Sequence, residues 1–502
     1  MLSFLQINPA DNVVVALQPL AKGRVIDVDG QTIRLVTDIP AGHKCAIRDI
    51  AEGENVIKYG FPIGHALHAI RRGSYLDHED IGTNLSGTLD YGDVRRQGLT
   101  LPSPSGEQLT FQGYLRPDGQ VGIRNEVWVI PTVGCVDGII KQIVERTKAE
   151  LGGGPIDGID GIFHFPHNYG CSQLGDDHEN TRKVLADMVH HPNAGAVLVV
   201  GLGCENNQPH AFEEFCGDYA RDRVRFMVCQ EVAGDEVAYG VGLLKELVER
   251  ARHDRRVTLP ASRLRIGLKC GGSDGFSGIT ANPLLGAFSD FLCETQGGTT
   301  ILTEVPEMFG AETMLMERCA SDELLRQTIA LINNFKNYYL SHGEPCGENP
   351  SPGNKAGGIS TLEEKALGCT QKSGRSAVCG VMEYGERLRN NGLNLLSAPG
   401  NDLVASTALA AAGCQLVLFT TGRGTPFGTF VPTLKVSTNT ALARRKPQWI
   451  DFNAGVLIED QRMDETLARF IRKVLSVASG ERTCNEAADI REIAIFKNGV
   501  TL

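Results

Sequence analysis

The chain has 502 residues, of which 42% are apolar and 22% charged, so it is long enough for two or three globular domains. Its net charge of −11 and its lack of a Lys/Arg-rich stripe argue against a nucleic-acid partner. No apolar run approaches the roughly 20 residues that span a bilayer, and residues 1–9 carry no secretory pattern. We therefore expect a cytoplasmic protein without a membrane partner.

The first 95 residues predict a small all-β module. Short β-branched or alternating runs lie at 12–17, 25–28, 32–36 and 45–47, and Asp29-Gly30 is a hairpin signal. A charged stretch with Gly and Pro follows, and we interpret residues 96–112 as a linker.

Beyond the linker the pattern is α/β, which we divide into domains at 113–260 and 261–502. Apolar strands alternate with helical segments, an order that favours parallel pairing with crossover helices. The predicted strands are 127–133, 161–165, 196–201, 264–268, 299–303, 393–396 and 415–420. Ligand-binding residues are then expected at the carboxyl ends of these strands. A polar tract at 342–374 interrupts the pattern and predicts a long, functional or disordered loop.

The fourteen cysteines are scattered and include no close C-x-x-C pair. In a long chain without a secretory pattern, this argues against a disulfide framework. Four of them follow predicted strands: Cys135, Cys171, Cys204 and Cys270. Because thiolates prefer soft metals, this set could bind iron or an iron–sulfur cluster. The alternative is that each thiol packs in a tight turn where a larger side chain would not fit.

Titratable side chains also follow the strands. His167 and His178 enclose a dense polar segment, whose groups suit metal binding or proton transfer. Asp176 and Asp177 in that segment could instead cap a helix. Glu304 and Glu307 could each be a base or a metal ligand, or could cap the helix that follows.

Three further segments offer polar groups. Residues 349–355 and Lys365 supply donors suited to a carboxylate and several hydroxyls, although a solvated loop is the simpler interpretation. Residues 422–426 resemble an anion cradle or an ordinary strand-ending turn. His43-Lys44, in the small module, has the pattern of a solvated turn.

Several long strings resemble the altronate/galactarate dehydratase family, from the first strands to the closing residues 494–502. They are Gly42–Lys44, Lys58–Gly60, Gly170–His178, Gly201–Asn207, Cys270–Asn282, Thr303–Met308, Asn349–Gly358 and Thr421–Pro426. The string Ser172–His178 matches the altronate branch better than the galactarate branch, and Cys369 also differs from the galactarate pattern.

The resemblance implies a small N-terminal SAF-type (antifreeze-like) β module joined to a large, multi-layer α/β body with mostly parallel sheets. It implies a hydro-lyase that converts a hexonate, with D-altronate the best match, to 2-keto-3-deoxy-D-gluconate and water. We expect the protein to be a homo-oligomer, as a dimer. The resemblance further implies a divalent metal, Fe2+ in the altronate branch, with Mn2+ or another divalent ion as alternatives. An iron–sulfur cluster stays open because of the four cysteines.

Such an elimination needs a base for the C2 proton, an acid for the C3 hydroxyl, and positive charge at the carboxylate. With the resemblance, we expect Glu304 or Lys355 to be the base, His178 the acid, and His43 a catalytic contribution from the small module. The expected metal ligands are His167, Cys171, Cys204, Cys135 and Cys270. The residues expected to hold the polyol are Lys44, Asn282, Ser273, Asp274, Asn354, Arg423 and Thr425.

Three alternatives remain at this point. The same scaffold could eliminate water from galactarate or sulfite from a sulfolactate. An aconitase-like iron–sulfur chemistry could operate on a different fold. A sugar-acid binding protein without catalysis is the alternative from another class, although no basic helix-turn-helix pattern supports it.

Overall fold

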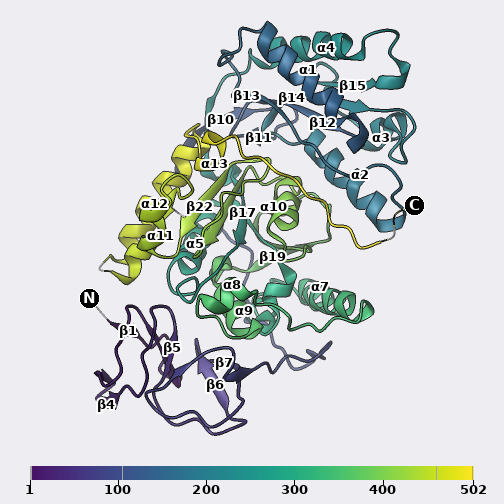
Figure 1. The fold of residues 1–502 in the computed structure, drawn as a ribbon. Coiled ribbons are helices and arrows are strands. Elements are labelled where there is room, and N and C mark those ends of the chain that lie inside the picture. The colour runs from purple at the N-terminus through teal and green to yellow at the C-terminus, as the bar shows by residue number, and fades with distance from the viewer. Residues whose placement is uncertain (1–2, 105, 460, 500, 502) are drawn as a thin grey trace.

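The computed structural model describes residues 3–104, 106–459, 461–499 and 501, and it has three parts (Figure 1). The small β module lies at one end, an α/β domain lies at the other, and the larger C-terminal domain lies between them. No helix among the described residues is both long and apolar enough to cross a membrane.

The N-terminal module consists of short antiparallel strands, as the sequence predicted. One sheet has the order β1-β2-β5-β8, a second has the order β6-β7-β9, and β3 pairs with β4. The hairpin between β3 and β4 turns at Asp29 and Gly30, whose φ values of +50° and +79° explain the preference for these residues. The strands are β1 (Phe4–Leu5), β2 (Val13–Ala16), β3 (Val25–Val28), β4 (Gln31–Arg34), β5 (Lys44–Ala46), β6 (Asn55–Lys58), β7 (Phe61–Ala66), β8 (Tyr75–Leu76) and β9 (Ile81–Gly82).

The segment that follows has no regular helix or strand among its described residues up to 109, but it is not free of the body. Tyr91 is buried in the main core of the C-terminal domain, and its hydroxyl donates to Glu312 at 2.6 Å. The predicted linker therefore starts in a segment that lies against the C-terminal domain.

The middle domain contains the predicted parallel sheet, with strand order β13-β12-β14-β15. A separate antiparallel sheet, β11-β10-β16, joins it to the C-terminal domain. The strands are β10 (Thr110–Leu115), β11 (Val121–Gly122), β12 (Glu126–Pro131), β13 (Gly161–His164), β14 (Ala194–Gly201), β15 (Val224–Val228) and β16 (Val257–Pro260). The helices are η1 (Gly134–Val136), α1 (Asp137–Glu150), α2 (Gly175–Val189), α3 (Pro209–Cys216), η2 (Cys229–Glu231) and α4 (Glu236–Ala251).

The C-terminal domain is built on a seven-stranded parallel sheet with the order β19-β20-β18-β17-β21-β22-β23. Its strands are β17 (Arg265–Cys270), β18 (Thr299–Leu302), β19 (Val378–Met382), β20 (Gly392–Leu396), β21 (Leu416–Thr421), β22 (Thr433–Ser437) and β23 (Phe452–Asn453). Its α-helices are α5 (Ala281–Asp290), α6 (Glu312–Met316), α7 (Asp322–Ser341), α8 (Pro352–Ala356), α9 (Leu362–Thr370), α10 (Asp402–Ala411), α11 (Thr440–Arg445), α12 (Met463–Ala478) and α13 (Cys484–Ala487). Short turns of other helix types are η3 (Ala261–Arg263), η4 (Phe291–Gln296), η5 (Val305–Met308), η6 (Gln371–Ser373) and η7 (Gly455–Ile458).

The prediction that residues 342–374 form a long loop was wrong in one respect, because this segment contains α8, α9 and η6. All nine residues of α9 are buried, including Glu363, Glu364 and Lys365. A helix that is covered on every side has no polar face, so the periodicity that usually reveals a helix is absent.

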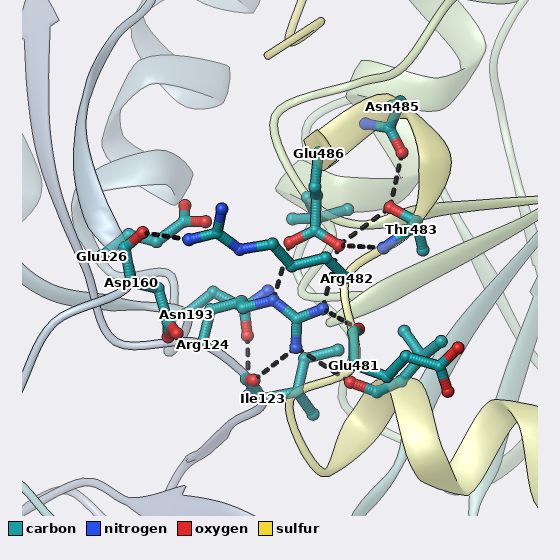
Figure 2. A network of polar contacts seen from close by, with 12 residues as sticks. Ile123, Arg124, Glu126, Asp160, Asn193, Glu481, Arg482, Thr483, Asn485 and Glu486 are labelled. Atoms are coloured by element: carbon teal, nitrogen blue, oxygen red, sulfur yellow. Dashed lines mark hydrogen bonds and ion pairs between the residues drawn. The ribbon is translucent and has the colours of Figure 1, made fainter. Parts of the chain in front are cut away.

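Shared apolar and polar contacts hold the three parts together. The β module continues its core into α9, where Ala366 and Leu367 pack with Val13 and Ile63. The middle and C-terminal domains share another apolar cluster between α2 and α10. Figure 2 shows a polar junction beside it, in which the Arg124 guanidinium binds Glu486 at 2.7 and 2.9 Å.

Candidate active site

The carboxyl edge of the seven-stranded sheet carries a buried group of charged side chains. Lys269 and Cys270 end β17, and Glu304 follows β18 two residues after its last position. Asp402 begins α10, after β20. Parallel strands place these ends at the same edge, which is where open α/β sheets bind ligands.

Glu304 is the centre of this group. It is fully buried, and it adopts the left-handed conformation with φ +69°, which is uncommon for a residue other than Gly or Asn. One carboxylate oxygen binds the Lys269 ammonium, and the other accepts from Lys372 Nζ at 3.1 Å and from the Cys270 amide at 3.1 Å. Strained backbone of this kind persists where the surroundings hold it, and it is concentrated at functional sites.

Positive charge surrounds the buried carboxylates. Lys269 also binds Asp402 at 2.8 Å, and Lys365 binds Glu307 at 2.7 Å. Burial alone would lower the pKa of Lys269, but the Asp402 and Glu304 carboxylates raise it above its usual range. Burial would likewise raise the pKa of Glu307, but Lys365, Lys269 and Lys372 hold it well below that range. The ion pairs therefore keep Glu307 and Lys269 charged in a water-poor site.

Two thiols and a carboxylate lie together beside Glu304. The Cys270 and Cys369 sulfur atoms are 3.4 Å apart, and they lie 3.2 and 3.1 Å from the same Glu307 oxygen. Three donor atoms of these residues fall within 4.8 Å of one another. The hydrogen bond to Cys270, together with burial, raises the pKa of Cys369 well above its usual range. The two thiols and the carboxylate are a donor set that a soft divalent ion prefers.

Polar residues predicted to hold the polyol surround the same edge, and most are already engaged. Asn282 donates to the Gly368 carbonyl at 2.9 Å and accepts from Thr420 at 2.7 Å. Asp274 accepts from Thr438, Ser277 and Asn439, and burial raises its pKa. These two side chains therefore fix loops of the site.

The other predicted polyol-binding residues at this edge differ from Asn282 and Asp274 in their contacts. The Asn354 amide donates to the Ser273 carbonyl at 2.9 Å. The Ser273 hydroxyl is buried and has no hydrogen-bond partner among the described residues. Arg423 is exposed at the rim, where its backbone amide binds the Gly272 carbonyl at 2.9 Å. Ser273 and Arg423 thus have polar groups that remain available to a ligand.

The N-terminal module covers this edge with two buried lysines. Lys44 and Lys58 both bind Glu364 of α9, at 2.9 and 2.7 Å. Lys44 also donates to the Gly358 carbonyl at 2.8 Å. The cavity enclosed between the module and the sheet edge has a volume of only about 10 Å³, which is room for about one water molecule.

Comparisons with known proteins divide the chain in the same order. Family models match residues 2–84 (altronate/galactarate dehydratase SAF domain), 113–252 (D-galactarate dehydratase/altronate hydrolase, second domain) and 261–501 (D-galactarate/altronate dehydratase, C-terminal). The chain is 54% identical to an altronate dehydratase of Escherichia coli K12 and 55% identical to one of Bacillus subtilis 168, over the full length of both partners. It is 32% identical to a galactarate dehydratase (L-threo-forming) of E. coli K12, over 95% of this chain and 93% of that one. This chain belongs to the altronate/galactarate dehydratase family.

Within this family member, the C-terminal domain and the module bring together only part of the predicted site. Glu304, Cys270, Ser273, Asp274, Asn282, Asn354 and Lys44 meet at the sheet edge. Thr425 and Lys355 are half-buried in the segments around that edge. The ring of His43 comes close to Gly358, and its Nδ1 lies 3.1 Å from the Tyr75 hydroxyl.

The remaining predicted residues lie in the middle domain: His167, His178, Cys135, Cys171 and Cys204. The four predicted cysteines are thus not one set, because Cys270 is buried in the C-terminal domain and the other three are exposed. Both nitrogens of His167 contact backbone, the Pro131 carbonyl at 2.9 Å and the Tyr169 amide at 3.2 Å. That imidazole fixes a loop in this structure, and burial lowers its pKa to about 4.

The sequence analysis missed Lys269, Lys372 and Asp402. Lys269 follows the apolar residues of β17, and a lysine in such a position is a usable signal because unpaired charge is rarely buried. Lys372 follows α9 without any periodic pattern, so only the tertiary structure reveals it.

Proposed function

We propose that this chain catalyses the dehydration of altronate to 2-keto-3-deoxygluconate. The observation that carries the proposal is the match over the full chain with two altronate dehydratases at 54% and 55% identity. The buried carboxylate–ammonium group at the C-terminal sheet edge supports the same reaction class. A homodimer and a cytoplasmic location, both expected from the sequence, are part of this proposal.

The reaction removes a weakly acidic proton from C2, so negative charge develops on the substrate carboxylate. Glu304 is the base in this proposal, since its carboxylate lies at the centre of the buried group. Lys365, Lys269 and Lys372 supply fixed positive charge within the same small volume. In a site without bulk water, such preorganised charge stabilises the transition state more than solvent would.

The acid that helps the C3 hydroxyl leave is assigned to Lys372 rather than to His178. The Lys372 ammonium lies 3.1 Å from Glu304, so a base and a proton donor are adjacent. His178 lies on α2 of the middle domain, outside this group. The acid role of His178 stays a prediction.

A divalent metal, with Fe2+ as the first choice, is proposed at Cys270, Glu307 and Cys369. The fit rests on three buried donor atoms within 4.8 Å, and two sulfurs favour iron over Mn2+ or Mg2+. Replacing the two thiol protons by one dication would leave the net charge of the buried group unchanged. When bound, the ion would supply Lewis acidity toward the substrate carboxylate.

Entry of a hexonate requires that this site open, because a cavity of about 10 Å³ cannot hold a six-carbon acid. The contacts that close it are the Lys44 and Lys58 ion pairs to Glu364. Movement of the N-terminal module away from α9 is therefore part of the proposal.

The deciding experiment is an anaerobic assay of the Fe2+-loaded protein on altronate, galactarate and mannonate, following the 2-keto-3-deoxy product. We expect turnover of altronate, and a loss of about 10²–10⁴-fold in kcat for Glu304→Gln. Glu312→Gln is the matched control, because Glu312 is also buried against a lysine, at 3.2 Å, but lies outside the proposed site.

Turnover of galactarate alone would keep the family and replace the substrate. No keto acid from any of the three acids would overturn the catalytic proposal in favour of a binding protein. The metal is tested separately by loading with Fe2+ without sulfide, when Cys369→Ser should retain less iron than the wild type.

A further inference from the structure

Three exposed thiols lie at the carboxyl edge of the middle sheet, outside the site described above. All fourteen cysteines lie within the described residues and are free, and only Cys135, Cys171 and Cys204 are exposed. A free cysteine is normally among the most buried residue types, since an exposed thiol is open to oxidation. Three such exceptions on three neighbouring loops call for a common cause.

The topology brings the three loops together. Cys135 follows β12, Cys171 follows β13 and Cys204 follows β14, and β12 is the strand between the other two. Because all three strands are parallel, their carboxyl ends lie at one edge of the sheet. The three thiols therefore come from three adjacent strand ends.

Backbone contacts hold these loops against one another. The Gly134 amide binds the Tyr169 carbonyl at 3.0 Å, and the Asn207 amide binds the Gly170 carbonyl at 3.0 Å. The Ser172 amide binds the Asn206 side chain at 2.7 Å. The loop of Cys171 is thus bonded on one side to the loop of Cys135 and on the other to the loop of Cys204.

A glycine precedes each of the three cysteines, and each glycine makes a close approach. A Cβ at Gly170 would lie 2.0 Å from the Thr132 carbonyl oxygen, and one at Gly134 would lie 2.3 Å from that of His167. A Cβ at Gly203 would lie 2.8 Å from the Gln230 side chain. A larger residue at position 134 or 170 would separate the loops of Cys135 and Cys171.

Each of the three cysteines lies shortly before a helix, and two of the sulfurs have polar neighbours. α1, α2 and α3 begin at residues 137, 175 and 209, so each cysteine precedes a helix N-terminus by two to five positions. In addition, Gln230 Nε2 donates to the Cys204 sulfur at 3.7 Å, and the Ser172 hydroxyl lies 3.7 Å from the Cys171 sulfur. Donors to sulfur of this kind tune metal-bound thiolates.

We infer that Cys135, Cys171 and Cys204 form a site for a [4Fe–4S] cluster, held by three thiolates and with one iron left to a solvent ligand. A single ion fits less well, because a tetrahedral Zn–S bond of about 2.3 Å requires sulfurs about 4 Å apart. The three sulfurs do not all lie within 4.8 Å of one another, in contrast to Cys270, Glu307 and Cys369. A cubane cluster binds each thiolate to a different iron and so accepts a wider spacing.

The inference does not depend on the proposed substrate, so its test does not use turnover. The full-length protein is mixed anaerobically with a synthetic [4Fe–4S] cluster that carries four 2-mercaptoethanolate ligands. Each protein thiol gives its proton to a departing mercaptoethanolate as its sulfur binds iron, so three ligands leave as free thiol without a change of oxidation state. After gel filtration we expect about four iron and four sulfide ions per chain, a broad visible absorption band, and an EPR signal on reduction.

Serine substitutions locate the cluster. Cys135→Ser, Cys171→Ser and Cys204→Ser should each reduce the retained iron by more than half, and the triple variant should retain none. Cys229→Ser is the matched control, because Cys229 follows β15 at the same edge but packs against the apolar core of the middle domain. Cys270→Ser tests whether the cluster is instead held at the buried group of Cys270, Glu307 and Cys369.

Two results would overturn the inference. One is a wild type that retains no sulfide after gel filtration although its circular dichroism spectrum shows it to be folded. The other is cluster retention that falls in Cys270→Ser and not in the three exposed-cysteine variants. Neither result would bear on whether altronate is the substrate, which the keto-acid assay decides.

Discussion

At the residue scale, Lys372 is the side chain on which the proposed acid catalysis rests. Its ammonium is buried and lies 2.8 Å from the Cys270 sulfur and 3.1 Å from Glu304. Burial alone would lower the pKa of Lys372, but Cys270 and Glu304 raise it well above its usual range. The group therefore stays protonated, as a stabiliser of negative charge must.

Lys372→Met should lower kcat for altronate by about 10²–10⁴-fold, with a smaller change in KM, because a proton donor acts mainly in the transition state. Steady-state kinetics with the keto-acid assay measure both constants. Lys336→Met is the control, since Lys336 is an equally buried lysine paired with Glu312. Equal kcat losses in the two variants would mean that Lys372 is structural only.

The same residues show what a sequence can and cannot predict about a site. Cys270 and Glu304 follow strands that are evident from their apolar runs, so their position at a sheet edge was predictable. Which of them face one another was not, because the partners Lys269, Lys365 and Lys372 come from two segments about 100 residues apart. No local pattern encodes that pairing.

The predicted fold class, in contrast, was confirmed, because the alternation of strands and helices follows local rules.

At the scale of elements, α9 is the helix of the body against which the N-terminal module packs. Its Glu364 is fully buried between Lys44 and Lys58. Burial would raise the pKa of Glu364, but these two lysines lower it from 4.5 to about 2. The ionised carboxylate therefore stabilises the docked module fully above about pH 4.5, and this contribution is lost as the pH falls through about 2.

Between pH 4.5 and 2 we expect the module to separate from α9, with about 3 kcal/mol of docking free energy lost. Small-angle X-ray scattering would detect this as an increase in the radius of gyration, and far-UV circular dichroism would show whether the domains remain folded. Glu364→Gln should produce the expanded form already at neutral pH. Glu54→Gln, in the N-terminal module, is the control, because the pair of Glu54 with Arg48 is exposed and so contributes little. A compact Glu364→Gln protein would contradict the docking role.

At the scale of the whole molecule, the middle and C-terminal domains are joined through a buried ion pair. Arg124 and Glu486 are both almost fully buried, and Arg124 also donates to the carbonyls of Val477 and Glu481 at 2.9 and 2.8 Å (Figure 2). Removing one partner of such a pair leaves an uncompensated charge, whereas removing both can be nearly neutral.

Arg124→Met should therefore destabilise the protein by about 3–5 kcal/mol, and Arg124→Met with Glu486→Met should recover part of that loss. Calorimetry of the two single variants and the double variant measures the coupling. Arg221→Met is the control, because the Arg221–Glu213 pair is exposed and long, at 3.9 Å. Strictly additive losses would show that the pair itself does not join the domains.

The C-terminal segment makes a second connection between these domains, and it reaches the loop that carries Cys171. It runs from the C-terminal domain to the start of α2 (Figure 1), where the amides of Asn498 and Gly499 donate to Asp177 at 2.9 Å each. Gln173 pairs with Thr501 in an isolated bridge. The Asp177 carboxylate thus binds a distant segment, which is a different use from helix capping.

Asp177→Ala removes a buried, charged acceptor from two backbone amides, so we expect the segment 490–499 to detach at a cost of about 1–3 kcal/mol. Amide hydrogen exchange should then accelerate in 490–499 and in the loop 166–174, while the seven-stranded sheet keeps its protection. Asp176→Ala is the matched control, because this neighbour is exposed on the same first turn of α2.

If the Cys171 loop depends on this segment, Asp177→Ala should also retain less of the synthetic cluster than Asp176→Ala does, because one of its three thiolates would no longer be held in place. Unchanged exchange in 166–174 would show that the loop contacts of Gly170 and Ser172 alone position that thiol.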